Sequence, residues 1–248
     1  MKIVVCVSHV PDTASKINVT ADGKSIDQNG LTYIVNPYDE FAIEEALKTK
    51  EKFGGEVTVI SLGTDANKES LRKALAMGAD NAILLKTDSI FDSFSLAKAL
   101  ANEINILQPE LVFMGKQSVD YDNSITGQLV AEFLGYNSVS VVVSLTIDGN
   151  KIIAEREIEG GKEVVETELP CLITAQKGLN EPRYASLKGI MSAKKKVIEE
   201  KPINITSHYT ETVKIKKPPM KQAGKIVGTD ANAVPELVRL LHEEAKVI

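Results

Sequence analysis

The chain has 248 residues, of which 43% are hydrophobic and 25% charged, so it is not a disordered, collagen-like or low-complexity protein. Its 34 acidic residues outnumber its 29 basic residues, and the formal charge of −5 argues against sequence-independent nucleic-acid binding. No apolar stretch approaches the roughly 20 residues of a membrane helix, and no secretory signal is visible. We therefore expect a cytoplasmic protein with no direct membrane insertion.

The first half of the chain alternates strand and helix patterns. Apolar runs of strand length occur at 3–8, 57–62, 82–85 and 111–114, and helical spacing covers about 39–53, 67–77, 94–104 and 124–134. Turn dipeptides within 17–34 predict a hairpin excursion before the first helix. Apolar strands that alternate with helices are typical of a parallel sheet with helices on both faces, so we predict a Rossmann-like α/β fold.

The second half has a different organisation. Residues 138–175 hold β-branched segments joined by glycine turns, which predicts an added antiparallel β extension. From about Gly178 the pattern is irregular, and 201–225 is rich in Lys, Pro and Thr. The spacing of apolar residues from Val234 to Leu241 predicts a helix at the end of a C-terminal arm. We divide the chain into a nucleotide-binding α/β domain (1–200) and a linker with a partner-docking helix (201–248). Docking of that helix back onto its own domain is the alternative.

The chemistry-bearing residues predict neither a metal site nor a catalytic site. Cys6 and Cys171 lie in strand-like apolar runs, which favours buried structural thiols. His9, His208 and His242 have no partner at metal-ligand spacing. No histidine or carboxylate pair is placed for acid–base chemistry. We therefore expect a protein that is not an enzyme and has no substrate chemistry of its own.

Three predicted strand ends are candidates for a nucleotide site, because ligands of open parallel sheets lie beyond the carboxyl ends of the strands. They are Cys6-Val7-Ser8, Leu62-Gly63-Thr64 and Gly115-Lys116-Gln117. The last leads to residues 122–126, where the amides of Ser124, Ile125 and Thr126 would form an anion site at a helix start. Neither a P-loop nor a G-x-G-x-x-G loop is present, so a monophosphate held by backbone amides fits best. The alternative is that 122–126 merely caps a helix.

Four stretches of the chain resemble the beta subunits of electron transfer flavoproteins. They are Asn36–Glu40, Ala74–Asp80, Gly115–Gln128 and Leu179–Lys196, and the resemblance extends from Met1 to about residue 200. It implies a heterodimer whose alpha subunit supplies most of the FAD site, while this chain holds a structural AMP. By motif position the AMP would meet Cys6, Asn36, Asp39, Leu62, Gly115, Asn123, Ser124, Ile125 and Thr126, and Tyr38 would lie toward the FAD of the alpha subunit.

The same resemblance implies binding to partner proteins. Residues 179–196 would form a recognition loop for acyl-CoA dehydrogenases of fatty-acid β-oxidation, with Leu187 as the anchor and Tyr184, Ile190 and Met191 beside it. Electrons would then pass to a membrane quinone oxidoreductase. Glu157 would face an arginine of the alpha subunit. From the residues alone, Leu187 is also compatible with an ordinary core leucine, and Lys194–Lys196 with a solvated charge run.

Departures from the family pattern favour one type of member. Electron-bifurcating relatives, which hold a second FAD in this subunit, typically read Asp-Gly-Asp-Thr-Ala-Gln-Val-Gly-Pro, whereas this chain has Tyr121 and Gln128 in place of that first Gly and the Pro. Thr13 stands where an aromatic residue is frequent, and Ser124-Ile125 replace the usual Asn-Gln. We predict the AMP-binding, non-bifurcating type. The alternatives are a bifurcating beta subunit and a stand-alone adenine-nucleotide-binding enzyme or stress-type protein.

Overall fold

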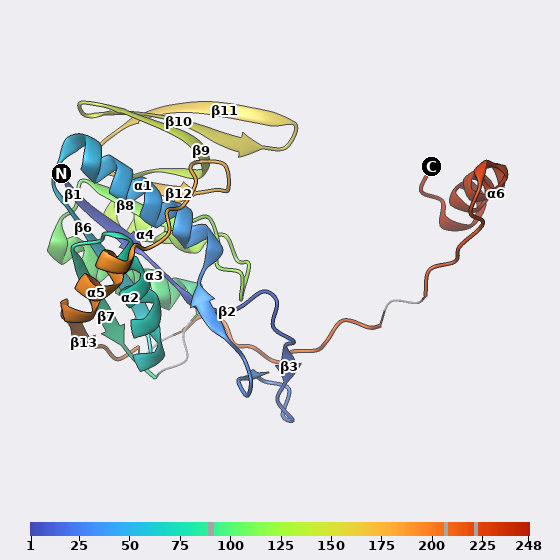
Figure 1. The fold of residues 1–248 in the computed structure, drawn as a ribbon, viewed down its shortest axis with the longest axis horizontal. Coiled ribbons are helices and arrows are strands. Elements are labelled where there is room, and N and C mark those ends of the chain that lie inside the picture. The colour runs from blue at the N-terminus through green and yellow to red at the C-terminus, as the bar shows by residue number, and fades with distance from the viewer. Residues whose placement is uncertain (89–91, 206–207, 221–222) are drawn as a thin grey trace.

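The fold is built on a central sheet that lies between helices in the computed structural model (Figure 1). The structure describes residues 1–88, 92–205, 208–220 and 223–248. In these ranges one sheet has nine strands in the order β11-β10-β9-β12-β8-β1-β6-β7-β13. Its strands are β1 (Lys2–Cys6), β6 (Glu56–Gly63), β7 (Asn81–Lys86), β8 (Leu111–Gly115), β9 (Asn137–Asp148), β10 (Lys151–Ile158), β11 (Gly161–Glu168), β12 (Cys171–Ala175) and β13 (Ile198–Pro202).

Helices cover both faces of this sheet. The core between sheet and helices on one face includes residues of α1 (Pro37–Phe53), α2 (Lys68–Met77) and α5 (Leu187–Lys195). On the other face the core includes residues of α3 (Ser93–Leu107) and α4 (Thr126–Leu134). The middle strands β1, β6, β7 and β8 are buried almost throughout, as strands covered on both sides must be. The predicted Rossmann-like fold is confirmed.

The strand order places a topological switch point between β1 and β8. These two strands are parallel neighbours, but the chain continues from β1 toward α1 on one face and from β8 to α4 on the other. Connections that diverge in this way leave a crevice at the carboxyl ends of the two strands. The strand ends after β1, β6 and β8 are therefore neighbours at one edge of the sheet.

The predicted β extension is partly antiparallel. β9, β10 and β11 pair antiparallel in sequence order, as expected from their glycine turns. The expectation is wrong for β12, which lies between β8 and β9 and is parallel to both. The pairing register of β9 shifts near Val141, a β-branched residue with φ of 62°. Beyond this irregularity β9 packs across α1 through Leu145 and Ile147.

Residues 9–35 form the predicted excursion between β1 and α1. β2 (His9–Pro11) pairs antiparallel with β5 (Tyr33–Val35), and β3 (Asn18–Val19) pairs with β4 (Ile26–Asp27). A short 3-10 helix, η1 (Asp65–Asn67), follows β6. Within the described residues, every helix is too short or too polar to cross a membrane.

The C-terminal quarter contains more regular structure than expected. The segment after Gly178, predicted to be irregular, holds α5 and the edge strand β13, which pairs parallel with β7. The chain then runs through an extended arm to η2 (Ala231–Ala233), α6 (Val234–Arg239) and a π-helical turn (Leu240–Ala245), which lie away from the sheet (Figure 1). Residues 206–207 and 221–222 of the proposed linker lie outside the described residues.

Candidate functional site

The N-terminus of α1 is tied to both strands that flank the crevice. The carboxylate of Asp39 accepts hydrogen bonds from the amide of Ser8, after β1, at 2.7 Å and from the amide of Gly115, in β8, at 3.0 Å. Asp39 is buried, and this burial raises the pKa of its carboxyl to about 7, although the two amide hydrogen bonds oppose the shift.

Asn36 makes a second set of cross-links at the same place. Its Nδ2 donates to the carbonyl of Gln117 at 2.8 Å, and its Oδ1 accepts from the amide of Val119 at 3.2 Å. The backbone amide of Asn36 donates to the carbonyl of Ser8. Asn36 is fully buried, so these bonds are made away from solvent. The predicted residues Asn36, Asp39 and Gly115 are thus brought together.

Position 115 needs glycine because there is no room for a side chain, and not because of its backbone conformation. A Cβ at this position would lie 2.4 Å from Asp39 Oδ1 and 2.7 Å from the Cβ of Tyr38. Any side chain would therefore separate β8 from the start of α1. Tyr38 itself is half-buried, and Lys116 Nζ lies 5.0 Å from its ring centroid, within the range of a cation–π contact.

The start of α4 carries no side-chain cap. Ile125 precedes the first helical residue, Thr126, and makes no capping hydrogen bond. The first amides of a helix have no acceptor within the helix, and the N-terminus of α4 lies at the carboxyl edge because α4 follows β8. Such amides, together with the helix dipole, are suited to an anion. The alternative that the side chains of 122–126 merely cap the helix is wrong.

The polar residues before α4 point elsewhere. Asn123 donates to Ser93 Oγ at 2.9 Å, and Ser124 Oγ donates to Gln117 Oε1 at 2.8 Å. Asp122 accepts from Gln117 Nε2 at 2.6 Å. Asp122 and Ser124 both have φ of 52°, so the loop turns sharply twice before the helix begins. Gln117, which was not singled out as a contact residue from the sequence, organises this loop.

The end of β6 completes the edge. Asn67 donates to Ser61 Oγ and to the carbonyl of Leu62, and accepts from the amide of Thr64 at 3.1 Å. Leu62 and Cys6 are both buried beneath the edge, and burial raises the pKa of the Cys6 thiol above its ordinary range. Cys171 is buried as well, and its pKa is raised to about 12 by the same cause. Both cysteines are thus the buried thiols that were predicted.

The segment before α5 is anchored on α1. The guanidinium of Arg183 makes a two-pronged hydrogen-bonded ion pair with the buried Glu44, at 2.8 and 2.9 Å, and also contacts Glu51. Asn180 donates to the carbonyl of Phe41 and to Glu45. Two-pronged Arg–carboxylate pairs fix geometry well. The anchoring acidic residues were not predicted, because their spacing on α1 matches that of ordinary surface residues.

The four predicted partner-binding residues of this segment form an exposed apolar group. The exposed fractions of the side chains are 97% for Tyr184, 83% for Leu187, 41% for Ile190 and 67% for Met191. The alternative that Leu187 is a core leucine is therefore wrong. Lys196 donates to the carbonyl of Ala79, so one lysine of the 194–196 run is occupied within the fold.

Glu157 lies on the β extension, far along the sheet order from the strands beside α5. It is exposed on β10 and accepts a hydrogen bond from Gln176 Nε2 at 2.8 Å. The neighbouring Arg156 pairs with Glu163 of β11 at 3.1 Å. The structure therefore does not group Glu157 with the residues of α5.

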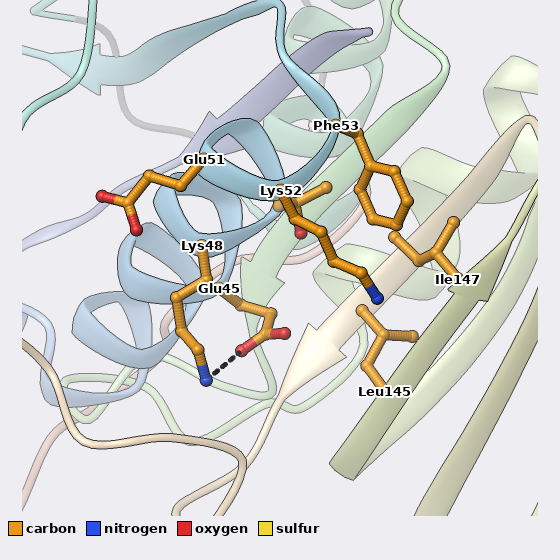
Figure 2. A pocket seen from close by; sticks show the side chains of 8 residues that line it. Glu45, Lys48, Glu51, Lys52, Phe53, Leu145 and Ile147 are labelled. Atoms are coloured by element: carbon orange, nitrogen blue, oxygen red, sulfur yellow. Dashed lines mark ion pairs between the residues drawn. The ribbon is translucent and has the colours of Figure 1, made fainter.

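A hollow of about 510 Å³ lies between the second half of α1 and β9 (Figure 2). Lys52 and Phe53 extend over Leu145 and Ile147, and Lys48 pairs with Glu45 on its other side. None of the predicted cofactor-binding or partner-binding residues lines it. Within the described residues, no group of three His, Cys, Asp or Glu side chains is arranged to hold a metal ion.

Comparisons with known proteins give a family assignment. Residues 24–205 match the model of the electron transfer flavoprotein domain family. The chain is 39% identical over 259 residues to the electron transfer flavoprotein subunit beta of Bacillus subtilis, with all of both chains covered. It is 38% identical over 256 residues to that of Bradyrhizobium diazoefficiens, again with full coverage, and 37% identical over 247 residues to that of Homo sapiens, with 96% of each chain covered.

Proposed function

The chain belongs to the family of electron transfer flavoprotein beta subunits, and we propose that it pairs with an alpha subunit that holds most of an FAD site. In this heterodimer the flavin supplies the electron-accepting chemistry when bound. The residues of this chain supply position: Tyr38, at the crevice, would lie toward the flavin, and the exposed Glu157 would meet the alpha subunit. No step of substrate chemistry is assigned to this chain.

The crevice between β1 and β8 is proposed as the site of AMP. The observation that carries this proposal is the uncapped start of α4, whose free amides stand at the crevice and suit a phosphate monoester. Asn123, Ser124, Ile125 and Thr126 would surround the phosphate through backbone groups. Cys6, Asn36, Leu62 and Gly115 would form the floor of the site, and Asp39 joins its two sides through the amides of Ser8 and Gly115. Tyr121 and Gln128, which stand where electron-bifurcating relatives typically have Gly and Pro, support AMP rather than a second FAD.

The exposed apolar side chains around α5 are proposed as the docking surface for acyl-CoA dehydrogenases. Leu187 would enter a pocket of the dehydrogenase, with Tyr184, Ile190 and Met191 around it. A small apolar centre with a polar rim suits a complex that must dissociate after each transfer. A membrane quinone oxidoreductase would then accept the electrons. The helix of the C-terminal arm, whose Val234, Leu237 and Val238 are about half exposed, would dock on the alpha subunit.

The test is the small-molecule content of the heterodimer. We expect the chain, co-expressed with its alpha subunit, to release one FAD and one AMP per heterodimer on denaturation, identified by mass spectrometry. Two FADs and no AMP would favour the bifurcating alternative. A stable isolated chain that turns over ATP would favour the stand-alone enzyme instead.

A further inference from the structure

Asp39 stands where two separate parts of the fold must stay in register. The chain diverges to opposite faces of the sheet after β1 and β8, and the parallel pairing of these two strands extends as far as Val5 and Phe113. Asp39 belongs to α1, which packs on one face only. Its carboxylate nevertheless contacts both sides of the crevice, because one oxygen accepts from the amide of Ser8, after β1, and the other from the amide of Gly115, the last residue of β8.

The contact between the Asp39 carboxylate and the amide of Gly115 leaves no space for a side chain at position 115. The absence of a side chain at Gly115 lets its amide approach the carboxylate to 3.0 Å, whereas a Cβ would lie 2.4 Å from the same oxygen. The amide of Ser8 is 2.7 Å from the other oxygen. A carboxylate that accepts one backbone amide on each oxygen is strongly oriented, and a buried one has little freedom to turn toward a ligand.

Electrostatics also argues against direct contact with a phosphate. In its ionised form the Asp39 carboxylate would repel a neighbouring phosphate monoester, and more so in a buried site than in water. By contrast, the uncapped amides at the N-terminus of α4 lie at the positive end of the helix dipole and would attract the phosphate. The carboxylate and the phosphate therefore fit different parts of the crevice.

We propose that Asp39 is a positioning residue, whose carboxylate clips the end of β1 to β8 and so fixes the width of the crevice, rather than a residue that contacts the bound nucleotide. We call the carboxylate with the amides of Ser8 and Gly115 the Asp39 clip. Its effect on nucleotide affinity rests on the proposed function, whereas the clip itself rests on the two distances.

The experiment uses the heterodimer with Asp39→Ala, Asp39→Asn and a matched control, Ile43→Val. Ile43 is a fully buried residue of the same helix, so its truncation weakens α1 packing without touching the strand ends. Two quantities are measured: hydrogen–deuterium exchange of peptides that contain Ser8 or Gly115 in nucleotide-free heterodimer, and the Kd for AMP by calorimetry.

We expect Asp39→Ala to speed exchange in both peptides and to weaken AMP binding by about tenfold. Asp39→Asn keeps one acceptor oxygen, so it should expose one of the two amides and weaken binding less. This variant also keeps the test informative if Asp39→Ala fails to fold. Ile43→Val should lower stability but leave both exchange and Kd unchanged.

Two results would overturn the clip. Unchanged exchange at Ser8 and Gly115 with lost AMP binding would make Asp39 a direct ligand contact. Faster exchange with an unchanged Kd for AMP would show that the clip does not set the width of the crevice. If wild-type heterodimer bound no AMP at all, the proposed function would fail instead, and the exchange data alone would then decide whether the clip exists.

Discussion

Helices α4 and α5 are both nine residues long, and both begin in segments to which we assign a function. They differ in the groups that they leave available for binding. The N-terminus of α4 is uncapped at Ile125, so its backbone amides are open. The N-terminus of α5 is capped by Ser186, whose side chain accepts from the amide of Gly189 at 3.0 Å. One helix thus offers its backbone and the other its side chains.

The packing of the two helices supports the same contrast. A Cβ at Gly127 of α4 would lie 2.6 Å from Thr174 Cγ2, so the first turn of α4 is pressed against β12. On α5, a Cβ at Gly189 would lie 2.3 Å from the carbonyl oxygen of Ala76, so the face of α5 that carries Gly189 packs closely against α2. Leu187 and Met191 of α5 are exposed. A backbone site suits a small anion, and a side-chain face suits a protein.

The largest effect on function is expected from truncating Leu187, a highly exposed apolar side chain of α5. Leu187→Ala should lower the kcat/KM for reduction of the heterodimer by its dehydrogenase by about 30-fold, because a docking hot spot contributes about 2 kcal/mol. AMP content and heterodimer formation should not change, since Leu187 is 83% exposed and belongs to neither site. Stopped-flow reduction kinetics provide the measurement.

Val164→Ala is the matched control for this variant. Val164 is also an exposed apolar residue, but it lies on β11, at the edge of the sheet opposite to β13. Its removal should leave reduction unchanged. Equal kinetics for Leu187→Ala and wild type would contradict the assignment of α5 as the docking helix.

The second prediction gives α4 the cap that it lacks. Ile125→Asp should place a carboxylate on the amides that we assign to the phosphate, and so weaken AMP binding by about tenfold. The same cap should stabilise the nucleotide-free protein by about 1 kcal/mol. Calorimetric titration with AMP and urea unfolding measure the two effects.

Ile125→Asn separates competition from charge. Asn caps helices about as well as Asp but carries no charge, so it should weaken AMP binding less than Asp does. A variant that becomes more stable without losing AMP affinity would place the phosphate away from α4.

The third prediction removes the cap that α5 has. Ser186→Ala should cost about 1 kcal/mol of folding free energy, because the amide of Gly189 loses its acceptor. Reduction by the dehydrogenase should slow less than in Leu187→Ala, since the apolar face remains. Ser186→Thr, which keeps a capping hydroxyl, should restore both quantities; failure of this rescue would show that the hydroxyl acts in some other way.

The sequence could predict the central sheet and α1–α4, because apolar residues there follow strand and helix periods closely. It could not predict α5, whose only buried residue is Ala193. That helix depends on tertiary contacts: Gly189 lies against α2, and Arg72 donates to the carbonyls of Ala193 and Lys196 at its C-terminal end. The edge strand β13 was missed because it carries charges, such as Glu200 paired with Lys68, instead of an apolar alternation.

The residues of the candidate site were proposed from the sequence, but the arrangement of their side chains could not be predicted from it. Asp122, Asn123 and Ser124 have the composition of a helix cap, and only the three-dimensional structure shows that their side chains turn away from α4. Asp39 resembles any acidic residue in a first helical turn. Its contact with β8 spans 76 positions of the chain, which no local pattern encodes.

The final prediction is a pH dependence of stability that arises from Asp39 in the crevice. Burial raises the pKa of Asp39 to about 7 in the folded chain, with Asp120 adding in the same direction, against an ordinary value of 3.8. Because the folded state then holds a proton that the unfolded state has lost, this group destabilises the fold progressively as the pH rises from about 4 to about 7. The side-chain amide introduced by Asp39→Asn does not titrate, so that contribution should disappear in the variant.

The stability of wild type relative to Asp39→Asn, measured by urea unfolding of the heterodimer, should therefore be greater at about pH 5 than at about pH 7.5. The difference between wild type and Ser186→Ala should be the same at both pH values, because Ser186 does not titrate. A difference that is constant with pH for Asp39→Asn would mean that the carboxyl stays ionised throughout, held by the amides of Ser8 and Gly115 more strongly than burial opposes it.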